Sequence, residues 1–240
     1  TLTVIIPPTG TSTPLVGTLA DAFTVTAGTG NWATGGPYGG RTVAIAIHPT
    51  MTDTVFVAAA KSGLYRTTDG GGEWELVLYN PDIWNILAVW PISPTVVFVG
   101  AGDGLYRSQQ GGEAGSWMPV DFGVGAPLEE ARALAIAPSD PFTMYCAISS
   151  TLFHSSDGGV SWQERNTGLP TVPWHLAVDP DDAATVYASF GEAGTLYKTT
   201  NAGQLWTQLP YSIPMTTDGT GGILAIAADP YRDNTLWLGT

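Results

Sequence analysis

Residues 64–74 read LYRTTDGGGEW, and this stretch returns three times along the 240-residue chain. It recurs as LFHSSDGGVSW at 152–162, as LYKTTNAGQLW at 196–206 and, with two extra residues, as LYRSQQGGEAGSW at 105–117. The tryptophans that end the four copies stand 43, 45 and 44 residues apart. Self-similarity at a fixed period of this length indicates a repeat architecture, so the repeat decides the fold.

Two other phrases recur in step with this stretch. An apolar run that ends at a proline is typical of a buried strand closed by a turn. It occurs at 46–49, 88–91, 135–138, 177–180 and, slightly altered, 227–230. Five residues after each proline, β-branched and aromatic residues in register indicate a second strand. These runs are 54–57, 96–99, 143–146, 185–188 and 235–238.

One unit of the repeat therefore holds four strands in about 44 residues, which is typical of a β-propeller blade. The C-terminus supplies two strands of a further blade at 223–238, and residues 23–34 resemble the two missing ones. We predict an all-β propeller of four-stranded antiparallel blades, with five blades closed by strands from both termini. The alternative is that the chain is a fragment of a larger propeller. The predicted propeller spans 21–240, after a Thr/Pro-rich segment or linker at 1–20.

The pattern Ser/Thr-x-Asp/Asn-x-Gly-x-x-Trp, here termed the turn box, has a physical logic. The carboxylate can accept hydrogen bonds from backbone N–H groups of its own turn, and the glycines permit positive φ. The tryptophan can bury a large ring between neighbouring blades.

The turn boxes resemble the Asp-box, or bacterial neuraminidase repeat, and the resemblance covers about residues 22–240. The resemblance implies a structural box at a hairpin away from the functional face. Similar boxes occur in sialidases, xyloglucan-active endoglucanases, sortilin-type receptors and a photosystem II assembly factor, mostly with six, seven or ten blades. The residues that carry the resemblance are Thr67, Asp69, Gly71, Trp74, Ser155, Asp157, Gly159, Trp162, Thr199, Asn201, Gly203 and Trp206.

Charge and cysteine content restrict the partners. The net charge is −13 with only eight Lys plus Arg, too few for the basic face that nucleic acids or anionic membranes require. No apolar span of 18 residues and no signal-peptide pattern is present, so no direct membrane insertion is expected. Cys146, the single cysteine, lies in an apolar run and is expected to be buried and inert. This acidic, cysteine-poor composition favours a secreted or cell-envelope protein of bacterial origin.

Candidate catalytic residues are few. A sialidase resembling the family would need three clasping arginines, but Arg66 and Arg107 occupy a repeat position on the third strand and are expected to be solvated. A glycosidase for neutral glycans needs two facing carboxylates. The candidates are Asp82, Glu129 and Glu130, which precede first strands and would rim the channel. The alternative is that they are solvated loop acids.

The same rim carries the candidate ligand-binding residues. Aromatic faces beside a few polar groups at a propeller mouth suit a sugar or a peptide. The alternative is that the tryptophans only cap the inner strands. The candidates are Trp84, Trp174, Arg41, Arg132 and His175.

No metal or cofactor is expected, because the three histidines do not form a ligand set and no nucleotide-binding glycine loop is present. The sequence favours a non-catalytic binding or assembly module for a glycan or protein ligand over an enzyme. The alternatives are a glycoside hydrolase resembling xyloglucan-active enzymes, and a structural subunit or fragment of a larger surface protein or filament. In the last case residues 1–20 would join neighbouring molecules.

Overall fold

The structure is a computed structural model of the chain and describes the segments that follow. They are 3–6, 15–18, 24–25, 32–33, 41–89, 95–124, 129–190, 194–212, 222–232 and 235–240. Throughout these segments the backbone forms strands, turns and loops, without a helix. Accordingly, no described helix could cross a membrane.

Four antiparallel sheets of four strands follow one another along the chain. The first contains β5 (Thr42–Ile47), β6 (Val55–Ala59), β7 (Gly63–Thr67) and β8 (Glu75–Leu78). The second contains β9 (Ile83–Val89), β10 (Val97–Ala101), β11 (Gly104–Ser108) and β12 (Trp117–Pro119). The third contains β13 (Ala131–Ile136), β14 (Met144–Ile148), β15 (Thr151–Ser155) and β16 (Gln163–Glu164). The fourth contains β17 (His175–Val178), β18 (Val186–Ser189), β19 (Thr195–Thr199) and β20 (Thr207–Ser212).

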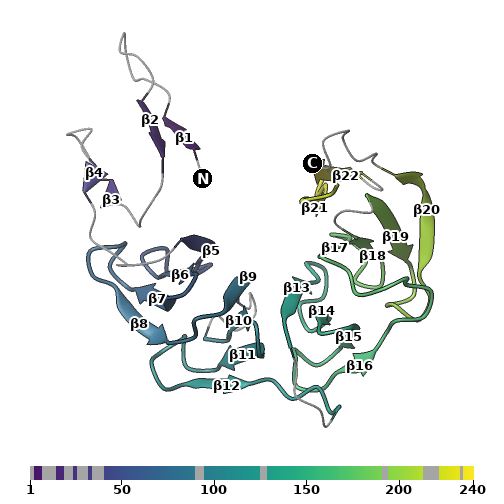
Figure 1. Cartoon of the computed structure of the whole chain (residues 1–240), viewed down its shortest axis with the longest axis horizontal. Coiled ribbons are helices and arrows are strands. Elements are labelled where there is room, and N and C mark those ends of the chain that lie inside the picture. The colour runs from purple at the N-terminus through teal and green to yellow at the C-terminus, as the bar shows by residue number, and fades with distance from the viewer. Residues whose placement is uncertain are drawn as a thin grey trace.

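The sheets stand side by side as an arc, each with its first strand toward the inside (Figure 1). The predicted all-β propeller of four-stranded antiparallel blades is confirmed in this arrangement. We therefore refer to the four sheets as blades 1 to 4.

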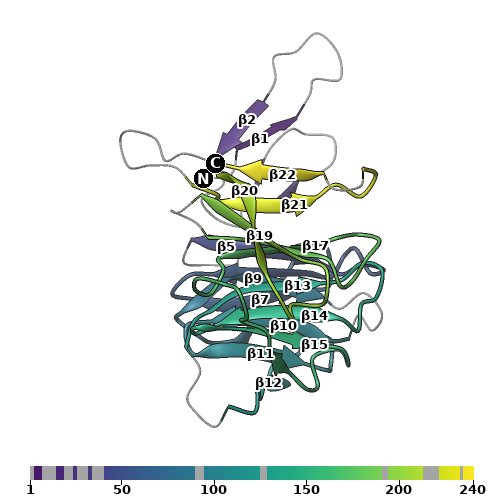
Figure 2. The ribbon, with the colours of Figure 1, turned by 90° about the vertical axis from the view of Figure 1, so that its right-hand side faces the viewer.

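Three two-stranded pairs complete the described strands. They are β1 (Thr3–Ile6) with β2 (Leu15–Thr18), β3 (Thr24–Val25) with β4 (Trp32–Ala33), and β21 (Ala225–Ala228) with β22 (Leu236–Gly239). The β1–β2 pair projects beyond the blades (Figure 2). The pairs β3–β4 and β21–β22, which the sequence joins into a fifth blade, form separate sheets. The five-bladed closure therefore stays a prediction.

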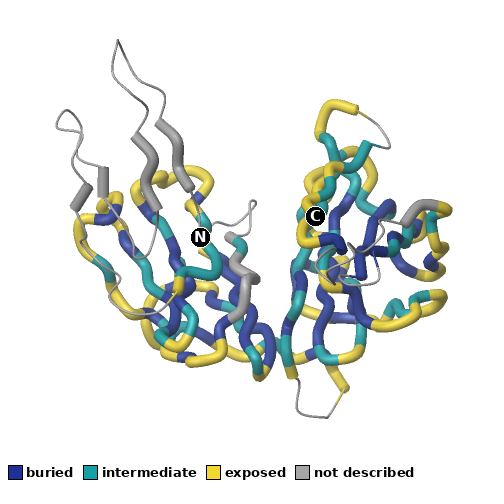
Figure 3. The backbone as a smooth tube through the Cα atoms, turned by 45° about the horizontal axis from the view of Figure 1, so that its top comes forward, coloured by how far each residue is buried: buried dark blue, intermediate teal, exposed yellow. Residues whose placement is uncertain are grey.

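The second strand of each blade is the most buried element (Figure 3). Every residue of β10, β14 and β18 is buried, and only the first residue of β6 is partly exposed. Burial on both faces explains why these strands read as continuous apolar runs rather than as alternating ones. Cys146 lies in β14 and is fully buried, as predicted, and burial raises the pKa of its thiol.

Successive blades are joined by aromatic contacts that repeat. The second-strand aromatic of one blade and the turn-box tryptophan of the next share a core cluster. The pairs are Phe56 with Trp117, Phe98 with Trp162, and Tyr145 with Trp206. A box glycine allows the close approach, because a Cβ on Gly159 would lie 3.2 Å from Cζ of Phe98.

Each turn box is also closed by its own hydrogen bonds. In blade 1 the Thr67 hydroxyl donates to Oδ1 of Asp69 at 2.7 Å and accepts from the Gly71 N–H at 3.0 Å. Asp69 Oδ1 accepts from the Glu73 N–H at 3.0 Å. In blade 4 the neutral Asn201 keeps this pattern, since its Oδ1 accepts from the Leu205 N–H at 3.0 Å.

The remaining two boxes differ in how their polar groups are satisfied. In blade 2 the Ser116 hydroxyl, 2.7 Å from the Ser108 hydroxyl, stands in for the missing carboxylate. In blade 3 burial by itself would raise the pKa of Asp157. Hydrogen bonds from Ser161, Ser155 and the Val160 N–H outweigh that effect and lower its pKa to about 2.

Backbone hydrogen bonds divide the blades into two faces. On the box face, the turn box bonds to the turn between the first two strands, as from the Gly70 N–H to the Asp53 carbonyl at 2.9 Å. On the opposite loop face, the segment before the first strand bonds to the hairpin between the second and third strands. The Ala60 N–H donates to the Arg41 carbonyl at 2.9 Å in this way. Every candidate ligand-binding residue whose side chain is described belongs to the loop face.

Candidate ligand-binding site

The structure brings three of the predicted site residues into contact on the loop face of blades 3 and 4. The Arg132 guanidinium lies over the Trp174 ring, with its Cζ 4.5 Å from the ring centroid. Its Nε also donates to Oε2 of Glu130 at 3.1 Å. Trp174 remains 45% exposed, so a large part of its surface is open to a ligand.

A β-bulge directs Arg132 toward Trp174. The pairing of β13 with β14 shifts register between Ala131 and Ala133, so that Arg132 is the extra residue. Bulges redirect side chains and are common next to functional sites. The first blade has a bulge at the equivalent place, between Thr42 and Ala44.

The loop that carries the two glutamates is fixed by the neighbouring hairpin. The Ser149 N–H donates to the Glu130 carbonyl at 2.9 Å, and the Ser149 hydroxyl accepts from the Glu129 N–H at 2.7 Å. Ser149 adopts a φ of 53°, a left-handed conformation that a non-glycine residue rarely takes. The hairpin therefore positions Glu129 and Glu130 through the backbone.

The guanidinium of Arg132 is held by two contacts, one with the Trp174 ring and one with the Glu130 carboxylate. A cation over a tryptophan ring contributes about 0.5–2 kcal/mol, more as water is excluded, and a partly exposed ion pair contributes about 0–1 kcal/mol. These contacts hold the guanidinium and the indole in one relative orientation. We term Glu130, Arg132 and Trp174 together the Arg–Trp platform.

A hollow of about 550 Å³ adjoins the platform and crosses all four strands of blade 3. The apolar lining comes from Val124, Ile148, Phe153 and Val172, and hydroxyl groups supply much of the polar lining. Glu129, Arg132 and Glu164 bring charged groups to it. Its size is that of a site for a small molecule or a short oligomer. The described lining carries two carboxylates and one guanidinium, which disfavours an anionic ligand.

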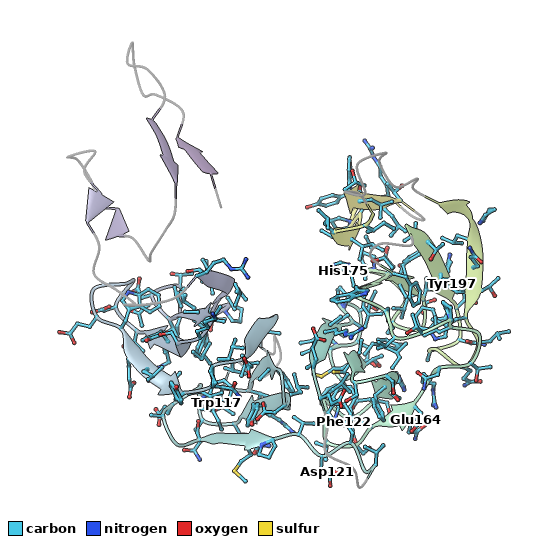
Figure 4. The ribbon with its side chains drawn as sticks, in the orientation of Figure 1. Trp117, Asp121, Phe122, Glu164, His175 and Tyr197 are labelled. Carbon is cyan, nitrogen blue, oxygen red and sulfur yellow. The ribbon has the colours of Figure 1, made fainter. Side chains whose placement is uncertain are left out.

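His175 takes part in a different environment. Its Nδ1 lies 3.1 Å from the Ser189 hydroxyl, and burial lowers the pKa of the imidazole. His175 lies on the inner side of the arc, whereas Glu164 lies on its outer side (Figure 4). Although His175 follows Trp174 in the chain, its imidazole does not line the hollow.

The other predicted residues lie apart from this site. Arg41 and Asp82 precede the first strands of blades 1 and 2, and neither lines the hollow. Trp84 belongs to β9, and its side chain lies outside the described residues.

Two arginines predicted to be solvated instead tie the scaffold together. Arg66 Nη1 donates to the Gly111 carbonyl of the next turn box at 2.9 Å. Arg107 is partly buried, with its Cζ 5.7 Å from the centroid of Phe98. Their scaffold role agrees with the sequence, but solvation was the wrong expectation. A third-strand side chain lies across the aromatic ring of the second strand and cannot extend fully into water.

Sequence reasoning missed Glu164. It lies in β16, two residues after Trp162, where it pairs with Phe153 of β15. Only the pairing register reveals that this outer-strand carboxylate shares a hollow with Glu129. Over the described part of the chain, no three His, Cys, Asp or Glu residues are grouped to hold a metal ion.

Comparisons with known proteins agree with the fold. No protein-family model and no curated protein matches the sequence. Among solved structures, an ancestral GH74 enzyme superposes with a TM-score of 0.67 at 20% identity, covering 83% of this chain and 29% of its own. The extracellular domain of the B. thetaiotaomicron protein BT4673, named as a one component system, gives 0.65 at 17% identity, covering 95% and 30%.

A third solved structure, YCF48 bound to D1 peptide, gives a TM-score of 0.55 at 15% identity, covering 82% of this chain and 59% of its own. At these identities the likeness establishes the fold alone. The chain spans less than two thirds of the length of each of these structures. The class defined by fold and comparison is thus the β-propeller.

Proposed function

We propose that the chain is a non-catalytic binding module of the Asp-box propeller type, secreted or attached to the cell envelope. Its ligand, a glycan or a protein segment, binds across the Arg–Trp platform and the adjoining hollow. The observation that carries the proposal is the Arg132 guanidinium held between Glu130 and a half-exposed Trp174.

The shape of the site suits a ligand that offers both an apolar surface and hydroxyl or amide groups. The open indole of Trp174 supplies a stacking surface, while Arg132 and the hydroxyls of the hollow supply hydrogen bonds. Glu129 and Glu164 add acceptors for hydroxyl or ammonium donors. A neutral sugar or a peptide with a basic side chain meets these requirements. YCF48, which binds a D1 peptide, shows that a protein of similar fold takes a protein ligand.

The test is binding of the wild type and of Trp174→Ala to arrayed neutral glycans and basic peptides. Loss of the stacking surface is expected to weaken binding by about tenfold or more. Leu205→Ala is the matched control, because it removes an exposed apolar side chain on the box face. Equal binding by the Trp174 variant, or equal loss in both variants, would contradict the proposed site.

A second candidate is a glycoside hydrolase, favoured by the presence of Glu129 and Glu164 in one hollow. Such enzymes use two carboxylates about 5–9.5 Å apart, one as an acid. The test is release of reducing ends from xyloglucan or another neutral glucan. Release by the wild type that is abolished in both Glu129→Gln and Glu164→Gln would favour the hydrolase over the binding module. Binding without release by the wild type leaves the binding module.

A further inference from the structure

A second hollow lies on the box face, between the turn boxes of blades 2 and 3. Its volume is about 340 Å³, and its lining comes from both boxes, from the third and fourth strands of blade 2 and from the segment that follows them. Among the described residues, none lines both this hollow and the one beside the Arg–Trp platform. Asp121, which belongs to the lining, lies on the outer side of the arc where blade 2 leads into blade 3 (Figure 4). The hollow is therefore a separate candidate site.

The hollow occurs where the turn box departs from the repeat. Blade 2 has two extra residues in its box, and Gln110 stands where blades 1 and 3 have Asp69 and Asp157. The Ser116 hydroxyl closes the turn in place of that carboxylate, 2.7 Å from the hydroxyl at the start of the box. Gln110 instead lines the hollow. The altered box thus leaves a polar side chain available for another role.

Arg107 lines the same hollow without a partner for its charge. Its Nε is buried and has no hydrogen-bond partner among the described residues, and no described carboxylate forms an ion pair with its guanidinium. Arg66 holds the same repeat position in blade 1, but its Nη1 donates to the Gly111 carbonyl at 2.9 Å. Burial lowers the pKa of Arg107, and the charge of Asp157 offsets this effect only in part. A partly desolvated guanidinium of this kind is stabilised when an acceptor reaches it, above all a carboxylate.

Two exposed apolar side chains, Met118 and Val160, line the hollow beside this charge. Each is 67% exposed. The other blades have polar or small residues at these two repeat positions, namely Glu75, Gln163 and Thr207 for the first and Gly72 and Gln204 for the second. Methionine adapts to the shape of a partner and is frequent at protein-binding surfaces. The described lining contains no aromatic ring on which a sugar could stack, so it favours a peptide.

From these observations we propose that the hollow binds a peptide segment that carries one carboxylate side chain between apolar residues. The carboxylate pairs with the Arg107 guanidinium, and the amide of Gln110 donates to it or to the peptide backbone. The apolar neighbours pack on Met118 and Val160. This site goes beyond the function proposed for the loop face, because it uses the opposite face and different residues.

Charge limits the kind of segment that can bind. The whole chain carries a net charge of −13, and Asp121 adds a carboxylate to the lining. A run of acidic residues would therefore be repelled, whereas a single carboxylate can still reach the guanidinium. Asp121 Oδ1 accepts a hydrogen bond from the Gly123 N–H at 2.8 Å, which an asparagine can also accept. Asp121→Asn is therefore expected to strengthen binding about two- to fivefold.

The test compares two arrays of capped heptapeptides on the full chain. One array has a central glutamate with varied apolar neighbours, and the other has glutamine in its place. The wild type is expected to bind members of the glutamate array and to bind their glutamine counterparts about tenfold or more weakly. Arg107→Gln should lose about the same factor. Lys198→Gln is the matched control, because it removes the same charge from the same repeat position in blade 4 and should bind like the wild type.

A further variant keeps the test independent of folding, since Arg107 also lies over the Phe98 ring. Met118 is exposed, so Met118→Glu should leave the midpoint of thermal unfolding unchanged, while its charge should weaken binding of the glutamate peptides about tenfold or more. Trp174→Ala should bind these peptides like the wild type, which separates this site from the loop face.

Three results would overturn the proposal. They are equal binding of the two arrays, binding by Arg107→Gln and Met118→Glu that equals that of the wild type, and no binding of either array by the wild type. Binding of oligogalacturonate in place of the peptides would assign the guanidinium to an acidic glycan and overturn the peptide assignment.

Discussion

Replacing Gly112 by alanine should destabilise the propeller because this glycine is pressed against the ring of the preceding blade. A Cβ on Gly112 would lie 2.9 Å from Cζ of Phe56 and closer still to its Cε1. It would also lie 3.3 Å from Cζ2 of Trp117, and Phe56 is fully buried, so neither ring has room to move. Gly112 also has a φ of 71°, which costs an alanine about 1–2 kcal/mol. With about 1–3 kcal/mol for overpacking, the expected loss is about 2–5 kcal/mol.

Gly111 supplies a matched control for the backbone contribution. Its φ is 65°, but a Cβ there would meet nothing within 4 Å. Gly111→Ala should therefore cost only the conformational part, about 1–2 kcal/mol. The assay is the midpoint of urea unfolding, followed by tryptophan fluorescence, for both variants in parallel.

A second substitution isolates the contact itself. Phe56→Leu removes the ring atoms nearest to the new methyl group, so in the Gly112→Ala background it should cost far less than it does alone. The expected coupling between the two sites is about 1–3 kcal/mol. Strictly additive effects, or equal losses for Gly111→Ala and Gly112→Ala, would refute the claim that the box glycine allows the blades to approach.

Three further predictions concern single side chains. Because the folded pKa of Asp157 is depressed to about 2, its stabilisation should be present above about pH 4 and be lost as the pH falls toward 2. Solvent screening limits this contribution to the free energy of unfolding to about 1 kcal/mol. The difference in stability between the wild type and Asp157→Asn, followed as a function of pH, measures it. Asn201→Asp should introduce a similar acid-sensitive contribution in blade 4. Trp206→Phe should cost about 1–3 kcal/mol, because it leaves the partly buried Arg165 carbonyl without its 2.9 Å N–H donor. Trp74 is partly exposed, so Trp74→Phe should lower the free energy of unfolding by less than Trp206→Phe does, and thermal unfolding of both variants measures the difference. Cys146 should resist thiol reagents in the folded protein and react only on unfolding, as absorbance of the released chromophore would show.

The fold was predictable from the sequence because each blade repeats the same pattern of strands and turn-box residues. The spacing from Trp74 to Trp206 fixes the period, and the apolar runs fix the strands within it. The turn-box hydrogen bonds follow from residues two to four positions apart, as in Thr67, Asp69 and Gly71. Such short-range chemistry can be recognised without knowledge of the tertiary structure.

The site was predictable only in part, because it depends on contacts across the repeat. The sequence singled out Glu130, Arg132 and Trp174 as candidates at or near the starts of first strands, and the structure places Glu130 and Trp174 directly before such strands and Arg132 within β13. The sequence did not show that a bulge directs Arg132 over a ring 42 positions later in the chain. Glu164 was missed because it comes from an outer strand, which the repeat alone assigns to the scaffold.

The two faces differ in what holds them together, and this difference explains where function can arise. On the box face, side chains make both the turn and the blade junction, so a substitution there affects the fold. On the loop face, the segments before the first strands are fixed by backbone bonds, from Ala60 to Arg41, from Gly102 to Asp82 and from Ser149 to Glu130. Their side chains are therefore free to differ from blade to blade at little cost in stability. The three carbonyl groups that accept these bonds belong to Arg41, Asp82 and Glu130, and Glu130 is part of the Arg–Trp platform.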